Sequence, residues 1–189
     1  FYTPKEIVQY MTQESLIQYL QTHLGEHEEL NNFIRNKNIG DRTAKHNYIR
    51  DNAAQIEKFL DNVKICDPAI GSGAFPMGML NEIFEAKMAL DMTLNRSEVK
   101  KKIIQNSIYG VDIESGAVDI ARLRFWLALV VDEDEPHALP NLDYKIMQGN
   151  SLLESFEGID LSEIHKGKAI TIDDGNSGDN LFSKVMEVQ

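Results

Sequence analysis

Three short strand-like runs separated by helical segments constrain the fold of this chain more than any other feature of its sequence. The runs are typical of buried strands and lie at residues 63–66, 108–113 and 144–148. The segments between them space their apolar residues as helices do, over residues 77–90, 98–106 and 116–131. Alternation of strands and helices favours a parallel sheet with helices on its faces, so the predicted fold class is α/β.

The same periodicity predicts which helical faces pack inward. In the helix at 77–90 this face comprises Met77, Leu80, Phe84 and Met88. In the helix at 116–131 it comprises Ile120, Leu123, Leu127 and Val131.

The N-terminal stretch has the signals of a helix start. Thr3 has the side chain of an N-cap, Pro4 suits the first helical position, and Glu6 would complete a capping box. Gly25 is expected to end this first helix. A second long helix is predicted over residues 44–62.

The length of 189 residues suits one domain, or one domain with a small appendage. We predict a helical segment over residues 1–62, an α/β core over 63–153 and an irregular acidic tail over 154–189. Because the sequence begins at Phe1, within a motif rather than at a methionine, we expect it to be part of a longer protein.

Composition limits the classes of partner. The net charge of −11 argues against tight nucleic-acid binding by this segment alone, because phosphate affinity comes from clustered Lys and Arg. Residues 31–50 are locally basic, which fits either a solvated helical surface or a phosphate-facing edge. No run of 18 apolar residues occurs, so no membrane partner is expected. The single cysteine, Cys66, fits a reducing cytoplasm and is predicted to be a buried thiol.

The stretch "DPAIGSGAF" follows the first predicted strand and has the form of a ligand-binding loop. Gly71 and Gly73 allow the backbone to approach a ligand, and the following helix favours negative charge at its start. Pro76 stands where a dinucleotide-binding loop needs its third glycine, and the carboxylate of Asp67 would repel a pyrophosphate. A ligand with both a carboxylate and an ammonium group fits better, and an amino acid moiety has both.

Polar residues also end the other two predicted strands. Asp112 is placed to accept hydrogen bonds from two ribose hydroxyls, which is a standard use of this position. Asn150 can both donate and accept, which suits the edge of an adenine ring. An amino acid, a ribose and an adenine occur together in S-adenosylmethionine, the predicted cofactor. A structural turn at each strand end is the alternative reading.

Four motifs occur in an order that resembles a known family: "YTPKEIVQYM", "DPAIGSGAF", "IYGVDI" and "QGNSLL". Over residues 1–153 the chain resembles the N-terminal part of adenine-specific DNA methyltransferases of bacterial restriction-modification systems. It is most similar to the large single-chain group that joins methyltransferase and endonuclease, and similar enzymes occur in phage defence. The resemblance implies a Rossmann-like, S-adenosylmethionine-dependent methyltransferase fold with a truncated parallel sheet.

The resemblance also implies which residues bind the cofactor. The backbone near Thr3 would hold the methionine carboxylate, Asp67 the amino group, and Asp112 the ribose hydroxyls. Ile113 would pack on the cofactor's adenine, and Asn150 would hydrogen-bond to the amino group of that adenine. The remaining implied binding residues line the loop or adjoin Asn150: Ala69, Gly71, Ser72, Gly73 and Ser151.

The sequence departs from the family pattern at two places that bear on function. Asn150 stands where an aspartate is common. The family's catalytic Asn-Pro-Pro-Tyr, which holds the flipped base, does not occur. We therefore assign no catalytic residue and expect this segment to be inactive by itself.

Two other functions fit the same motifs. A methyltransferase of this fold could act on RNA or protein, or the segment could be an interaction module that has lost its ligand. We expect DNA contacts to come mostly from outside these residues, and the open edge of a truncated sheet to favour self-association.

The stretch "HLGEH" is not expected to bind zinc. The stretch matches a peptidase zinc pattern, but Gly25 weakens the helical turn that would have to present both histidines. No metal ligand is predicted.

Overall fold

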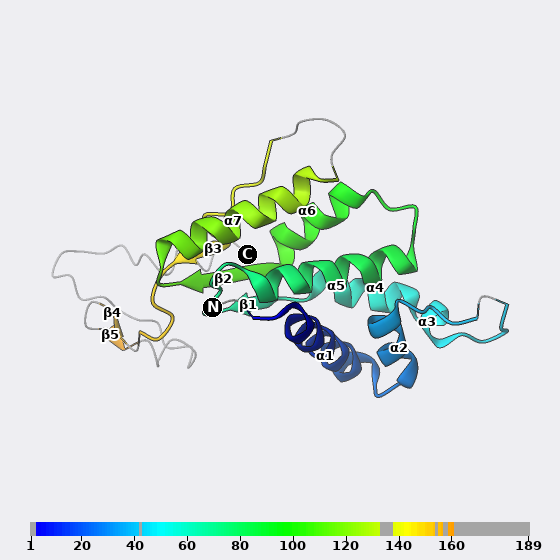
Figure 1. Ribbon diagram of the computed structural model, residues 1–189. Coiled ribbons are helices and arrows are strands. Elements are labelled where there is room, and N and C mark those ends of the chain that lie inside the picture. Colours follow the sequence, from blue (N-terminus) through cyan, green and yellow to red (C-terminus); the bar gives the residue numbers. More distant parts are fainter. Residues whose placement is uncertain (1–2, 42, 133–137, 154, 157–158, 161–189) are drawn as a thin grey trace, which may run out of the picture. The chain divides into compact units, whose positions relative to one another are not determined.

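The computed structural model describes residues 3–41, 43–132, 138–153, 155–156 and 159–160 (Figure 1). The chain divides into two units, Phe1–Gly149 and Asn150–Gln189. In the second unit, β4 (Ser155–Phe156) and β5 (Ile159–Asp160) form an antiparallel pair. None of the helices described is long and apolar enough to cross a membrane.

The first unit contains a three-stranded parallel sheet in the order β1-β2-β3. Its strands are β1 (Ile65–Asp67), β2 (Ile108–Asp112) and β3 (Ile146–Gln148). Asp67 pairs with Gly110, and Asp112 pairs with Gln148, so all three strands point the same way and their carboxyl ends meet at one edge. The predicted α/β class with a parallel sheet is confirmed.

Seven helices occur among the described residues, all in the first unit (Figure 1). Four precede the sheet: α1 (Lys5–Leu24), α2 (Glu28–Asn36), α3 (Tyr48–Asp51) and α4 (Ala53–Asn62). Three connect the strands: α5 (Ala74–Leu90) and α6 (Arg96–Ser107) lead from β1 to β2, and α7 (Ser115–Val130) leads from β2 to β3. The helix predicted over 44–62 is therefore two helices, and it begins only at Tyr48, where Asn47 caps α3 by accepting from the Arg50 N–H.

The start of α1 differs from the predicted capping box. Pro4 is the cap and Lys5 the first helical residue, with no side-chain cap hydrogen bond. The Pro4 carbonyl instead accepts from the N–H groups of Ile7 and Val8, at 3.1 Å each. Backbone groups thus close the first turn without Thr3. At the other end Gly25 terminates the helix as predicted, with φ near +90° and its N–H on the Gln21 carbonyl.

The core lies around α5, whose predicted inward face is confirmed. Leu80 and Phe84 are buried in the core, and Met77 and Met88 are partly buried and pack against it. The inward face predicted for α7 is wrong. Its four members are 46 to 80% exposed: Ile120, Leu123, Leu127 and Val131. The buried face of α7 consists of Val118, Ala121, Phe125 and Leu129. Apolar residues occur all round this helix, so their spacing alone does not choose between two faces.

One face of the sheet is better covered than the other within the described residues. Ile65 and Ile146 are buried, whereas their neighbours Cys66 and Met147 are exposed. Successive strand residues point to opposite faces, so Cys66 lies on the uncovered side. The prediction that Cys66 is buried is therefore wrong.

A buried network of hydrogen bonds and ion pairs connects α1 and the end of α2 to α5. Glu82 of α5, only 6% exposed, accepts from Gln13 Nε2 at 3.2 Å and from Lys37 Nζ at 2.5 Å. Nearby, Arg35 pairs with Glu14. With Arg50, which lies 3.7 Å from Asp51, three of the cations in the basic stretch are engaged in ion pairs within the fold, whereas Arg42 lies outside the described residues.

Close packing of α1 on α5 depends on Gly78. A Cβ at this position would lie 2.7 Å from Val8 Cγ1 and 2.9 Å from Thr12 Cγ2. We expect Gly78→Ala to lower the free energy of unfolding by about 1–3 kcal/mol through overpacking, measured by urea denaturation. Gly116→Ala is the matched control, because its Cβ would meet nothing closer than 3.9 Å. Equal stability of the two variants would contradict this packing.

Candidate functional site

The loop between β1 and α5 folds by hydrogen bonds within itself. Asp67 Oδ1 accepts from the Ala69 N–H at 3.1 Å, and the Ile70 carbonyl accepts from the Gly73 N–H at 2.8 Å. Gly71 and Gly73 have φ of +51° and +82°, a conformation that residues with a Cβ rarely adopt. The two glycines are thus required by the turn itself, as well as suited to close backbone approach.

The loop is also tied to the end of β2. The Ile70 N–H donates to the Val111 carbonyl at 3.0 Å, and the Gly71 N–H donates to Asp112 Oδ2 at 2.7 Å. Ile70 is 4% exposed and lies over Gly110, where a Cβ would come within 2.3 Å of Ile70 Cδ1. The loop that follows β1 and the residue that ends β2 are therefore joined directly by hydrogen bonds.

Asp112 is held as an ionised acceptor. Its Oδ1 accepts from the Glu114 N–H at 3.0 Å, while Oδ2 accepts from Gly71. These backbone donors, Glu114 first and then Gly71, lower the pKa of Asp112 below its ordinary value. Each carboxylate oxygen has a second lone pair, so the side chain can still accept two hydroxyl groups.

An exposed apolar side chain follows Asp112 directly. Ile113 is 69% exposed, and its carbonyl accepts from Gln148 Nε2 at 3.1 Å, which links it to the end of β3. An apolar group at this position, beside a carboxylate, offers a surface on which a flat ring can pack.

The start of α1 lies near the same loop. Thr3 lines a pocket of about 520 Å³ with residues from the start of α5 and from α7, among them Ala74 and Arg124. The first N–H groups of a helix have no partner within it, so the start of α5 adds hydrogen-bond donors and partial positive charge. The pocket thus places Thr3 beside Ala74, the first residue of α5, whereas Asp67 and Asp112 are not among the residues that line it.

Asn150 and Ser151 belong to the second unit. Asn150 Oδ1 accepts from the Leu152 N–H at 3.0 Å, which forms a local turn. Their predicted part in binding adenine stays a prediction.

Arg124 is a site residue that the sequence did not reveal. Its Nη1 donates to the Ser72 carbonyl at 2.9 Å, so α7 holds the loop through a side-chain hydrogen bond. The only signal in the sequence is a pair of arginines within a mostly apolar helix, and that pattern does not say what either of them contacts.

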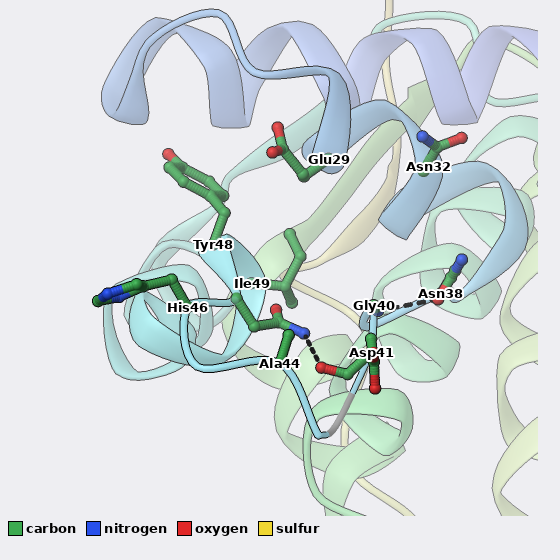
Figure 2. A pocket seen from close by; sticks show the side chains of 10 residues that line it. Glu29, Asn32, Asn38, Gly40, Asp41, Ala44, His46, Tyr48 and Ile49 are labelled. Atoms are coloured by element: carbon green, nitrogen blue, oxygen red, sulfur yellow. Dashed lines mark hydrogen bonds between the residues drawn. The ribbon is translucent and has the colours of Figure 1, made fainter.

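A second cavity, of about 290 Å³, lies between α2 and α3 (Figure 2). Its polar groups hold one another: Asn38 Oδ1 accepts from the Gly40 N–H, and Asn47 Nδ2 donates to the Asp41 carbonyl. Asp41 Oδ1 in turn accepts from the Thr43 N–H. This arrangement stabilises the loop before α3.

The histidines of "HLGEH" pack on aromatic rings. His23 lies 4.6 Å from the Phe59 ring and its Nδ1 lies 2.9 Å from the Tyr19 carbonyl oxygen, while His27 stacks on Tyr48 at 4.0 Å. No group of three or more metal-ligating side chains occurs in the part of the chain that the structure describes.

Comparison with known families identifies the domain. The model of the MmeI DNA-methyltransferase domain matches residues 42–166, which is more than half of the chain. This chain belongs to the MmeI DNA-methyltransferase domain family. The predicted resemblance to DNA methyltransferases is confirmed, and the matched residues of this methyltransferase domain include both the loop after β1 and Asp112.

A protein of Methanocaldococcus jannaschii, assigned as a type II restriction enzyme and methyltransferase, is 32% identical to this chain over 174 residues. The match covers 81% of this chain but 14% of that relative. This chain therefore spans only a small part of the relative's length.

Proposed function

We propose that this chain is the S-adenosylmethionine-binding part of a restriction-modification methyltransferase that methylates the exocyclic amino group of adenine in DNA. The observation that carries the proposal is the direct link between Gly71 and Asp112. It places an ionised acceptor next to a glycine-rich loop at adjacent strand ends. Membership of a DNA-methyltransferase family and the similarity to the archaeal restriction enzyme support the same assignment.

The described residues fit the chemistry of the cofactor. Asp112 has free lone pairs for two ribose hydroxyls, and Ile113 has an exposed apolar surface for the adenine. Asp67, half-buried, suits the ammonium group, and the donors at the start of α5, near Thr3, suit the carboxylate. S-adenosylmethionine supplies the transferable methyl group, and these residues would bind and orient it.

A Rossmann-like fold for the complete domain is part of the proposal. The strand order β1-β2-β3 matches one half of a doubly wound sheet, in which β1 lies next to the point where the order reverses. Ligands in such sheets bind beyond the carboxyl ends of the strands near that point, which is where the loop and Asp112 lie.

Specificity for adenine as the methylated base rests on the resemblance of the sequence motifs to adenine-specific enzymes rather than on a described contact. Asn150 and Ser151 follow β3 and are proposed to contact a different adenine, that of the cofactor. None of the 189 residues is assigned to catalysis, because the Asn-Pro-Pro-Tyr associated with attack on the amino group is absent from them.

The test is to identify the methylated product. The complete polypeptide encoded by the gene would be incubated with labelled S-adenosylmethionine and duplex DNA, and the DNA digested to nucleosides for mass spectrometry. We expect the label in N6-methyladenine. A label in methylcytosine would overturn the adenine assignment, and a label only in added RNA or protein would overturn the DNA assignment.

A further inference from the structure

Helix α7 contacts the loop at two successive residues. Arg124 Nη1 lies 2.9 Å from the Ser72 carbonyl oxygen and 3.5 Å from Ser72 Oγ. One turn earlier on the same face, Ala121 Cβ lies where a Cβ on Gly73 would approach within 3.3 Å. The loop therefore rests on α7 by one polar contact and one packing contact.

The contact with Arg124 fixes the orientation of one peptide group. The Ser72 carbonyl is held by Arg124, and the N–H of the same peptide, that of Gly73, donates to the Ile70 carbonyl at 2.8 Å. The next peptide N–H belongs to Ala74, the first residue of α5. The Ser72–Gly73 peptide thus lies directly before the N–H groups at the start of α5 that have no partner within the helix.

Arg124 also faces the pocket that contains Thr3. A guanidinium group has five N–H donors, and within the described residues only those on Nη1 have a hydrogen-bond partner. The acids that line the pocket, Glu82 and Glu85, both lie near Lys37, at 2.5 and 3.7 Å from its Nζ. Arg124 is therefore not neutralised by either of them through an ion pair.

We propose that Arg124 is a positioning residue for the amino-acid end of the cofactor. By holding the Ser72 carbonyl, it orients the loop backbone and the donors at the start of α5 toward the ligand's carboxylate. This inference rests on the proposed binding of S-adenosylmethionine, and it adds a residue outside the four motifs.

The test compares two ligands that differ only at that end. S-adenosylhomocysteine and 5′-methylthioadenosine are both neutral thioethers at sulfur with the same adenosine, but only the first has the amino-acid group. In the complete polypeptide, we expect Arg124→Met to weaken S-adenosylhomocysteine about 10- to 100-fold, as for loss of hydrogen bonds involving a charged group. Binding of 5′-methylthioadenosine, measured by competition, should stay within about twofold. Arg124→Lys should restore part of the loss, because an ammonium can donate to the same carbonyl.

Arg122→Met is the matched control. Arg122 lies on the same helix but donates to β3 rather than to the loop: its Nε and Nη2 lie 2.9 and 2.6 Å from the Ile146 carbonyl oxygen. We expect it to leave the ratio of the two affinities unchanged, and circular dichroism would verify that all variants fold.

Two results would overturn the inference while leaving the proposed function intact. One is unchanged S-adenosylhomocysteine binding by folded Arg124→Met, and the other is an equal loss for both ligands. Failure of the wild-type polypeptide to bind either S-adenosylhomocysteine or S-adenosylmethionine would overturn the proposed function and, with it, this inference.

Discussion

Replacing Asp112 with asparagine is expected to weaken S-adenosylmethionine binding by at least about 100-fold, because two hydrogen bonds from hydroxyls to a carboxylate contribute about 1.5–3 kcal/mol each. The substitution is isosteric, but the amide has one acceptor oxygen and an NH2 group that cannot accept from the N–H of Gly71 or Glu114. The affinity would be measured by isothermal titration calorimetry.

The matched control is Asp91→Asn. Asp91 also accepts from a backbone N–H two residues later, that of Thr93, and its pKa is likewise lowered, first by the Thr93 hydroxyl. It follows α5 at the end far from the loop. Affinity should be unchanged in this variant. A loss of binding as large as that of Asp112→Asn would show that the effect is not specific to the strand end.

The second large effect is expected for Gly110→Ala. The new Cβ would lie 2.3 Å from Ile70 Cδ1 and 3.0 Å from Ile70 Cβ and Cγ1, so the whole side chain must move. Ile70 is buried and its N–H donates to the Val111 carbonyl, so a shift of Ile70 would also displace the loop. We expect a loss of about 1–3 kcal/mol in the free energy of unfolding, together with weaker cofactor binding. Urea denaturation and calorimetry would measure the two effects.

A double-mutant cycle tests the cause directly. In a background of Ile70→Ala, the space beside residue 110 is larger, so adding Gly110→Ala should cost much less than it does in the wild type. Residues in contact typically show such coupling, with magnitudes of about 0.5–3 kcal/mol. Strict additivity of the two substitutions would show that the steric contact between Gly110 and Ile70 is not what limits the stability.

The parallel sheet and the meeting of the loop with Asp112 could be predicted because both follow from local sequence. Apolar runs of strand length alternate with helical segments, and the carboxyl ends of parallel strands share an edge. Gly71 and Gly73 were recognised from their spacing, and both have positive φ.

Features that depend on tertiary packing could not be predicted. Helix α7 has apolar residues on two faces, and its packing on the rest of the fold decides that Ala121 and Phe125, which lie beside Gly73 of the loop, are inside. Cys66 is exposed because one side of the sheet is poorly covered within the described residues, which a strand pattern alone does not show. The contact of Arg124 with Ser72 joins residues 52 positions apart and leaves no periodic signal.

Several predictions made from the sequence stay predictions. They include the segment boundaries at 62 and 153 and the roles of all the predicted cofactor-binding residues, Asn150 and Ser151 among them. They also include self-association through the open edge of the truncated sheet, in which β1 and β3 each have a single neighbour among the described strands. A clean monomer in light scattering over a wide concentration range would contradict it.

Calorimetric titration of S-adenosylmethionine tests the central claim most directly. It would be done on the complete polypeptide and on the 189-residue chain, each verified as folded by circular dichroism, with Asp67→Ala as a further variant. The account predicts saturable binding of one cofactor per polypeptide, lost when Asp67 is replaced. A folded complete polypeptide that binds no S-adenosylmethionine would contradict it.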